Sequence, residues 1–130
     1  MPLISIKALP FDPQIEIDSA LKSLSEKIAI QCQIDREHIM ITWEWLSYEH
    51  YVHHGAVVDK QQQGSHPVLI ELIAPNYYSH DNIKFLMELI ATDISSNLPI
   101  NRNNIFISYT PAYSEGIYDQ GHVVNWEDNY

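Results

Sequence analysis

The sequence contains few basic residues: Lys and Arg together number 7 against 17 Asp and Glu, a formal net charge of −10 over 130 residues. Surfaces that bind nucleic acid or anionic membranes are rich in Lys and Arg, so we expect neither partner. No apolar run approaches the roughly 20 residues that span a bilayer, and no basic leader with a long apolar stretch follows Met1. A single cysteine, Cys32, cannot form an internal disulfide, so we expect a reducing, cytoplasmic location.

Hydrophobic residues nevertheless make up 45% of the chain, which is typical of a protein with a packed core. We expect a single domain, residues 1–130. Two stretches, 2–46 and 68–112, align without a gap at an offset of 66, so that Ile34 falls on Ile100 and apolar positions fall on apolar positions. Chance similarity of two amphipathic helices is the alternative, but alignment through strand, helix and strand favours an internal repeat.

Each repeat is predicted to form a strand, a helix and a second strand. The expected strands are 3–8, 39–46, 68–74 and 104–110, the last ended by Pro111. Apolar residues recur at three- and four-residue spacing over 17–32 and 83–98, which indicates helices packed on one side. We expect the first helix to begin at Asp12-Pro13 and the second at Ser79 or Asp81.

Strand–helix–strand units of this size pair their strands in parallel. The predicted fold class is therefore α+β: tandem duplicated βαβ units that form one four-stranded mixed sheet with two helices on one face. On the uncovered face we expect Trp, Ile and Phe side chains from the strands, too apolar to remain in water, so we expect a homo-oligomer. The linker 47–66 is predicted to be a polar loop, and the tail 112–130 to hold a hairpin near Glu115-Gly116 or Gln120-Gly121.

Met1-Pro2 directly before the first strand, followed by two tandem βαβ units, resembles the tautomerase superfamily, which includes 4-oxalocrotonate tautomerase and macrophage migration inhibitory factor. The sequence is more similar still to a small branch of that superfamily. Its members begin Met-Pro, carry a Glu on the second strand, here Glu44, and end with a pattern matched by Tyr118-Asp119-Gln120-Gly121-His122. The resemblance implies a trimer with its active site at the subunit boundary, around an N-terminal proline.

In the reaction that the resemblance implies, removal of Met1 would leave Pro2 as a secondary amine. Apolar surroundings would lower the pKa of this amine. A neutral amine can take a proton from a carbon beside a carbonyl and return it elsewhere, which is keto–enol tautomerisation of a small carbonyl acid. The alternative is that Pro2 merely begins a strand. The family's substrate-binding arginine falls on Ile39, with Arg36 nearby, and the Tyr and Asn of its last strand fall on Phe106 and Ser108.

Glu44 and His122 are candidate acids or bases, His122 being oriented by Tyr118 and Asp119. Two alternatives for Glu44 have equal weight: its side chain lies on a solvated strand face, or it forms a hydrogen bond between subunits. Arg36 is either a carboxylate clamp or, as we favour, an ion-pairing residue near a helix end. Phe106, Ser108 and Tyr118 complete the expected substrate-binding set.

Four histidines lie in the polar loop, His50, His53, His54 and His66, and with Glu49 or Asp59 they could ligate zinc. Their spacing fits no standard site, so we expect no metal and no cofactor. Two functions therefore stand: a proline-based tautomerase acting on a small molecule, and a non-catalytic trimeric binding or assembly protein of the same fold. A third, a ferredoxin-like RNA-binding domain, shares the order of elements but is disfavoured by the charge of −10.

Overall fold

The computed structural model describes residues 2–11, 15–47, 49–58 and 68–127. The strands of the main sheet are β1 (Leu3–Ala8), β2 (Met40–Trp45), β5 (Val68–Pro75) and β6 (Ile105–Ala112). The helices are α1 (Asp18–Gln31) and α2 (His80–Asn97), with short 3₁₀ turns η1 (Arg36–His38) and η2 (Arg102–Asn104). Two small hairpins are formed by β3 (Tyr51–His53) with β4 (Ala56–Val58), and by β7 (Tyr118–Asp119) with β8 (His122–Val123). In these described residues, no helix combines the length and apolarity needed to cross a membrane.

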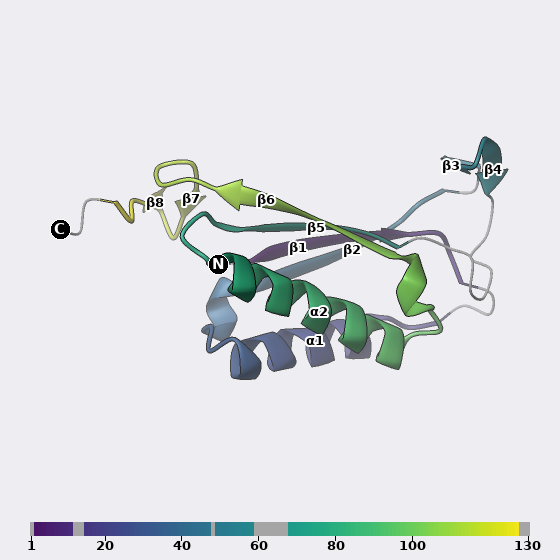
Figure 1. Ribbon diagram of the computed structural model, residues 1–130, viewed down its shortest axis with the longest axis horizontal. Helices are drawn as coiled ribbons and strands as arrows, with labels where there is room; N and C mark the ends of the chain where they lie inside the picture. The colour runs from purple at the N-terminus through teal and green to yellow at the C-terminus, as the bar shows by residue number, and fades with distance from the viewer. Residues whose placement is uncertain (1, 12–14, 48, 59–67, 128–130) are drawn as a thin grey trace.

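The main sheet has the strand order β2-β1-β5-β6. β1 runs parallel to β2, and β5 runs parallel to β6, while the two inner strands are antiparallel to each other. Both helices cover the same face of the sheet (Figure 1). The predicted α+β fold of two βαβ units is therefore confirmed. Each helix joins neighbouring parallel strands, which excludes the split βαβ units of a ferredoxin-like domain.

The two βαβ units agree in detail as well as in outline. Asp35 precedes η1 and its side chain accepts a hydrogen bond from the Glu37 amide at 3.3 Å. Asn101 precedes η2 and accepts one from the Asn103 amide at 2.9 Å. Each turn follows the C-terminal end of its helix and leads the chain into the second strand of its unit, where a short polar side chain caps the turn. Because the two units run antiparallel, the two turns lie at opposite ends of the helix layer (Figure 1).

The core lies between the sheet and the two helices. Alternate residues of the inner strands are buried there, including Ile4 and Ile6 of β1 and Ile70 and Leu72 of β5. α1 contributes Leu24 and Ile28, and α2 contributes Leu86, Ile90 and Ile94. Because strand side chains alternate between faces, the intervening residues of each strand line the other, open face of the sheet.

The expectation that Trp side chains lie on the open face is wrong. Trp43 pairs with Ile6, whose side chain is buried on the helix side, and Trp43 itself packs against the core. Trp45 pairs with buried Ala8, and its ring lies 5.4 Å from that of Trp43. The alternation along β2 was predicted correctly, with Trp43 and Trp45 on one face. Which face of the strand turns toward the helices depends on the pairing of β2 with β1.

Three predicted boundaries change. α1 begins at Asp18, later than expected; the predicted start at Asp12-Pro13 lies outside the described residues, and residues 15–17 are not helical. Pro111 does not end the last strand, since β6 continues to Ala112. β6 is an edge strand, where the missing amide of a proline removes no essential ladder bond. Of the two caps expected for α2, Ser79 is the one used, and its hydroxyl accepts from the Asn82 amide at 3.1 Å.

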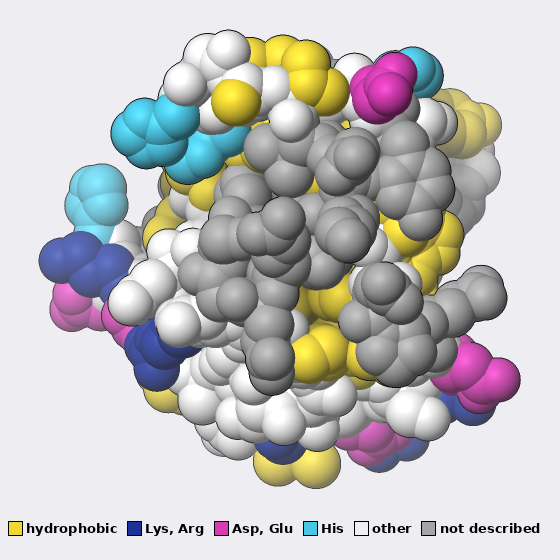
Figure 2. All heavy atoms as spheres, turned by 90° about the vertical axis from the view of Figure 1, so that its right-hand side faces the viewer, with side chains coloured by type: hydrophobic (Ala, Val, Ile, Leu, Met, Phe, Trp, Pro, Cys, Tyr) yellow, Lys and Arg dark blue, Asp and Glu magenta, His cyan; other side chains and the backbone are white. Residues whose placement is uncertain are grey.

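The linker is not wholly a loop, because the β3–β4 hairpin forms within it. His54 and Gly55 both have positive φ, as a two-residue type I′ turn requires, and the same holds for Gln120 and Gly121 in the β7–β8 hairpin. The two hairpins lie at opposite ends of the sheet (Figure 1). Figure 2 looks onto the β3–β4 end and shows histidine side chains gathered at its rim.

Candidate functional site

Pro2 lies at the end of the sheet where β1 and β2 begin and β5 ends. It is buried, and its carbonyl oxygen accepts a hydrogen bond from the Met40 amide at 3.1 Å. The antiparallel pairing of Leu3 with Ile73 brings the last residues of β5, Ala74 and Pro75, to the same end. Met1 lies outside the described residues. Pro2 is therefore buried at the start of β1, and its carbonyl group is hydrogen-bonded to β2.

The segment after β6 folds back over this end of the sheet. The Asn76 amide donates to the Ala112 carbonyl at 2.8 Å, and the Trp126 indole Nε1 donates to Asn76 Oδ1 at 3.1 Å. The rings of Tyr77 and Trp126 meet edge to face with centroids 5.6 Å apart. The β7–β8 hairpin, which lies between Ala112 and Trp126 in the chain, is thereby held near the start of β1 (Figure 1).

A cavity of about 240 Å³, here called the end cavity, opens between this segment and the sheet. It is lined by His38, Pro75, Tyr77, Asp119, Gln120, His122, Val124 and Trp126. Two imidazoles therefore reach one cavity from distant parts of the chain, His38 from η1 and His122 from β8. An imidazole ring has two nitrogen atoms that can donate or accept hydrogen bonds, so the pair can contact an oxygen atom of a ligand and take part in proton transfer.

Local hydrogen bonds order the hairpin side of the end cavity. Asp119 Oδ1 accepts from the Gln120 amide at 3.0 Å, and His122 Nδ1 lies 3.3 Å from the Gln120 carbonyl oxygen. When Nδ1 is engaged there, Nε2 is the nitrogen left to meet a ligand. Sequence reasoning identified His122 but missed His38. The signal for His38 was its position just before the second strand of the first repeat, at the end of the sheet where Pro2 begins the first strand.

Arg36 is not brought to this cavity. Its side chain is exposed and donates to Glu26 Oε2 at 2.6 Å. Arg102 of the second repeat behaves alike, since it contacts Glu88 and donates to Thr92 Oγ1 at 3.0 Å. Both arginines thus link the turn after a helix to the helix itself, which supports the ion-pairing interpretation of Arg36 over the carboxylate clamp.

Glu44, Phe106 and Ser108 lie on the open face of the sheet. Glu44 pairs with Lys7, five residues beyond Pro2, which at roughly 3.3 Å per residue is about 16 Å away. Phe106 and Ser108, on β6, line a shallow cavity of about 230 Å³ together with Ser5, Lys7, Leu69, Ile70 and Glu71. Within one chain, Pro2 therefore lies at the same end of the sheet as the end cavity that His122 lines, whereas Glu44 lies far along the sheet and Phe106 and Ser108 line a different cavity. Tyr118 lies on the hairpin with its side chain 72% exposed and lines none of the cavities described here.

The candidate metal ligands are only partly described. His53 and His54 have ring centroids 4.6 Å apart in the β3–β4 turn, and His50 precedes β3. Asp59 and His66 lie outside the described residues. Within the described residues, no group of three or more His, Cys, Asp or Glu side chains is arranged to hold a metal ion.

Known proteins resemble this chain in structure rather than in sequence. No protein-family model matches the sequence, and no curated protein matches it. In structure the chain is similar to a fused 4-OT asymmetric trimer, with 13% identity over 93% of this chain and 94% of that chain, and a TM-score of 0.78. It is also similar to a macrophage migration inhibitory factor homologue from Prochlorococcus marinus, with 18% identity over 93% and 98% of the two chains and a TM-score of 0.70.

A third similar structure is a member of the cis-3-chloroacrylic acid dehalogenase family, with 10% identity over 94% of this chain and 82% of that chain, and a TM-score of 0.76. These structures resemble this chain over more than nine-tenths of its length while sharing few identical residues. Identities this low establish the architecture and leave the site to be argued from its own residues. The chain has the tautomerase superfamily fold.

Proposed function

We propose that the protein is a tautomerase-type isomerase that moves a proton on a small carbonyl acid at the end cavity. The observation that supports the proposal is that Pro2 lies at the start of β1, at the end of the sheet where His38, Pro75 and His122 line the end cavity. Pro2 is not itself among the described residues that line this cavity. An amine and an imidazole are both groups that serve as general bases or acids in proton transfer. We propose no cofactor for this reaction, because proton transfer alone accomplishes it.

In this proposal Pro2 acts as the base after loss of Met1. Its position is buried, and burial disfavours an ammonium ion, so a free amine there would be neutral at a lower pH than an exposed one. The amine removes a proton from the carbon beside the substrate carbonyl. His122 or His38 donates a hydrogen bond to the carbonyl oxygen, which carries negative charge as the enolate develops.

We further propose that the protein assembles as a homotrimer in the cytoplasm. Three of the similar structures are described as trimers of fused 4-OT, asymmetric in two and symmetric in the third. The open face of this chain carries Phe106, which is 61% exposed, and Met40, which is 43% exposed; burial of these apolar residues by another copy is therefore favoured. In such a trimer Phe106 and Ser108 of one copy would border the Pro2 site of its neighbour, and Glu44 would serve an interface.

The first experiment is the intact mass of the protein purified from its native host, because a retained Met1 makes Pro2 an amide nitrogen and overturns the mechanism. With Met1 absent, enol–keto conversion of phenylpyruvate is followed by ultraviolet absorbance. Pro2→Ala should lower kcat/KM by at least about 100-fold, the low end of general-base contributions. His122→Gln should lower it less, and His50→Gln, at the opposite end of the sheet, should leave it unchanged.

The alternative function is a non-catalytic trimeric binding or assembly protein. The observation that favours it is the pairing of Arg36 with Glu26, which leaves the end cavity without an arginine among the described residues that line it. Absence of activity in a protein with a free Pro2, together with a trimeric mass by light scattering, would establish this alternative instead.

A further inference from the structure

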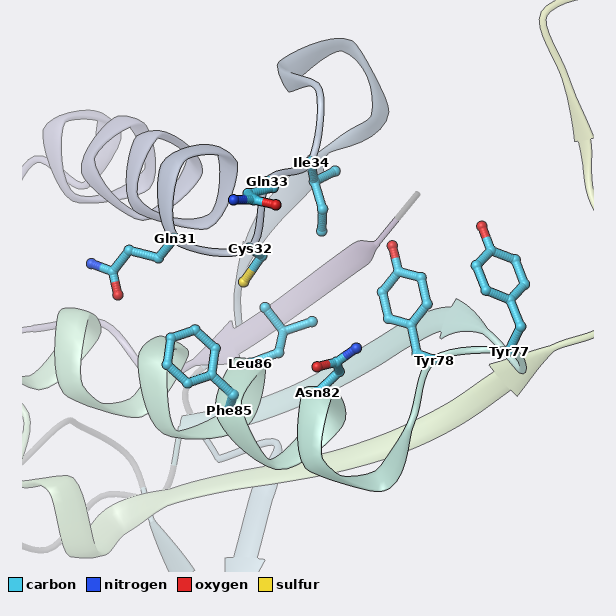
Figure 3. A pocket seen from close by; sticks show the side chains of 9 residues that line it. All are labelled: Gln31, Cys32, Gln33, Ile34, Tyr77, Tyr78, Asn82, Phe85 and Leu86. Atoms are coloured by element: carbon cyan, nitrogen blue, oxygen red, sulfur yellow. The ribbon is translucent and has the colours of Figure 1, made fainter.

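A larger cavity, here called the helix-end cavity, lies on the helix side of the sheet. Its volume is about 550 Å³, and it opens where α1 ends and α2 begins. It is lined by Gln31, Cys32, Gln33, Ile34, Tyr77, Tyr78, Asn82, Phe85 and Leu86. In Figure 3 the rings of Tyr77 and Tyr78 stand side by side at one end of the cavity, and Phe85 lies at the other. Cavities of this volume are typical of sites for small organic ligands.

No side chain that is charged at neutral pH lines this cavity. Burial raises the pKa of the Cys32 thiol, so the thiol is protonated. Burial, and then Tyr77, Cys32 and Tyr109, raise the pKa of the Tyr78 phenol, which is neutral as well. An anion or a cation would lose part of its hydration here without gaining an ion pair. The lining thus selects against charged ligands.

The lining also offers specific contacts for a ring. The rings of Tyr77, Tyr78 and Phe85 provide edges and faces for aromatic contact, and Ile34 and Leu86 provide an aliphatic wall. The side-chain amides of Gln31 and Asn82 and the Tyr78 hydroxyl can donate to or accept from a polar substituent. We propose that the helix-end cavity is a binding site for an uncharged small molecule that carries an aromatic ring, separate from the end cavity.

The two cavities share Tyr77, which lines both. On the far side, the Tyr77 ring contacts Trp126, whose indole Nε1 donates to Asn76. A ligand that contacts Tyr77 in the helix-end cavity therefore alters the surroundings of the Trp126 indole. Trp43 and Trp45 contact each other and Phe11 instead, so their indole signals serve as internal references.

The experiment is a titration of the ¹⁵N-labelled protein with p-cresol, followed by ¹H–¹⁵N spectra. Saturable shifts of the Trp126 indole and of the Cys32 and Leu86 amides are expected, with the Trp43 and Trp45 indoles unmoved. Benzoate, of similar size but anionic, should bind at least about tenfold more weakly, since a buried unpaired charge is disfavoured. Equal binding of benzoate, or shifts without saturation, would overturn the proposal.

Variants distinguish this site from the end cavity. Phe85→Ala should weaken p-cresol binding about fivefold, the loss expected for one aromatic contact. Phe85 is 48% exposed, so the variant is expected to fold. Ile30→Ala removes, from the last turn of α1, an exposed apolar side chain that does not line the cavity, and it should leave p-cresol binding unchanged. His122→Gln should also leave p-cresol binding intact; a loss there, with none in Phe85→Ala, would assign the ligand to the end cavity and refute the proposal.

Discussion

Lys27 and Asp93 occupy equivalent positions of the two repeats, 66 residues apart, and form an ion pair where α1 packs against α2. Asp93 is 1% exposed, whereas the Lys27 side chain is 45% exposed. Ser23 Oγ and Asn97 Nδ2 also donate to Asp93 Oδ1, at 3.3 and 3.1 Å. Equivalent positions of the two repeats thus carry opposite charges here, and their ion pair joins the two helices where they pack together.

Removing one partner of this pair should destabilise the fold. Lys27→Met leaves the Asp93 carboxylate buried without its cation, and we expect a loss of about 2–3 kcal/mol, below the loss for a fully buried pair because Lys27 is half exposed. The double variant Lys27→Met/Asp93→Leu should recover most of that loss, because both charges are then gone. Urea unfolding of the two single variants and the double variant measures the coupling. A loss of unfolding free energy in the double variant equal to the sum of the two single losses would refute the coupling between Lys27 and Asp93.

Arg36→Gln should have little effect. The Arg36–Glu26 pair is exposed on both sides, and such pairs contribute less than about 1 kcal/mol. Thermal unfolding should change slightly, and turnover of phenylpyruvate should not change. A large rise in KM with an unchanged unfolding temperature would instead assign Arg36 to substrate binding in the assembled protein.

Stability should fall at alkaline pH because of Tyr78. Its folded-state pKa is raised above the ordinary 10.0, first by burial and then by Tyr77, Cys32 and Tyr109. The neutral phenol is therefore favoured in the folded protein. This contribution is fully present below about pH 10 and is lost as pH rises toward the folded-state pKa. The free energy of unfolding of Tyr78→Phe, measured with urea between about pH 8 and 11, should fall less steeply with pH than that of the parent protein. An identical pH dependence in the two proteins would show that Tyr78 does not cause the alkaline loss of stability.

Phe106→Glu should disrupt self-association. Phe106 is the most exposed large apolar side chain on the open face, and a carboxylate there could not be buried against another copy. Light scattering should show a lower mass for Phe106→Glu than for the parent. Ile30→Glu places the same charge on an equally exposed site of α1, on the opposite side of the protein, and should leave the mass unchanged.

Trp126→Ala should loosen the β7–β8 hairpin. The variant removes both the hydrogen bond to Asn76 and the ring contact with Tyr77. Amide exchange at Asp119 and His122 should accelerate, while exchange at core residues such as Leu72 should not, because the hairpin opens locally. The proposed tautomerase activity should fall through a rise in KM. Unchanged hairpin exchange would show that other contacts hold the end cavity.

The order of elements could be predicted from the sequence because it depends on local periodicity. Leu3–Ala8 is a strand, and the helix stripes through Leu24 and Ile90 face the core, since apolar spacing alone determines which side of an element is buried. The gapless repeat likewise predicted the duplication. His122 and Pro2 were both identified, but as separate candidates.

Only the tertiary structure decided which residues meet. Whether Trp43 faces the helices follows from its pairing with Ile6, and the meeting of His38 with His122 follows from the fold-back of the C-terminal segment through Trp126 and Asn76. Such contacts join residues far apart in the chain, and no local spacing encodes them. The scarcity of basic residues argued against nucleic acid and anionic membranes, but only the fold shows that both arginines are engaged by neighbouring helix side chains rather than by the end cavity.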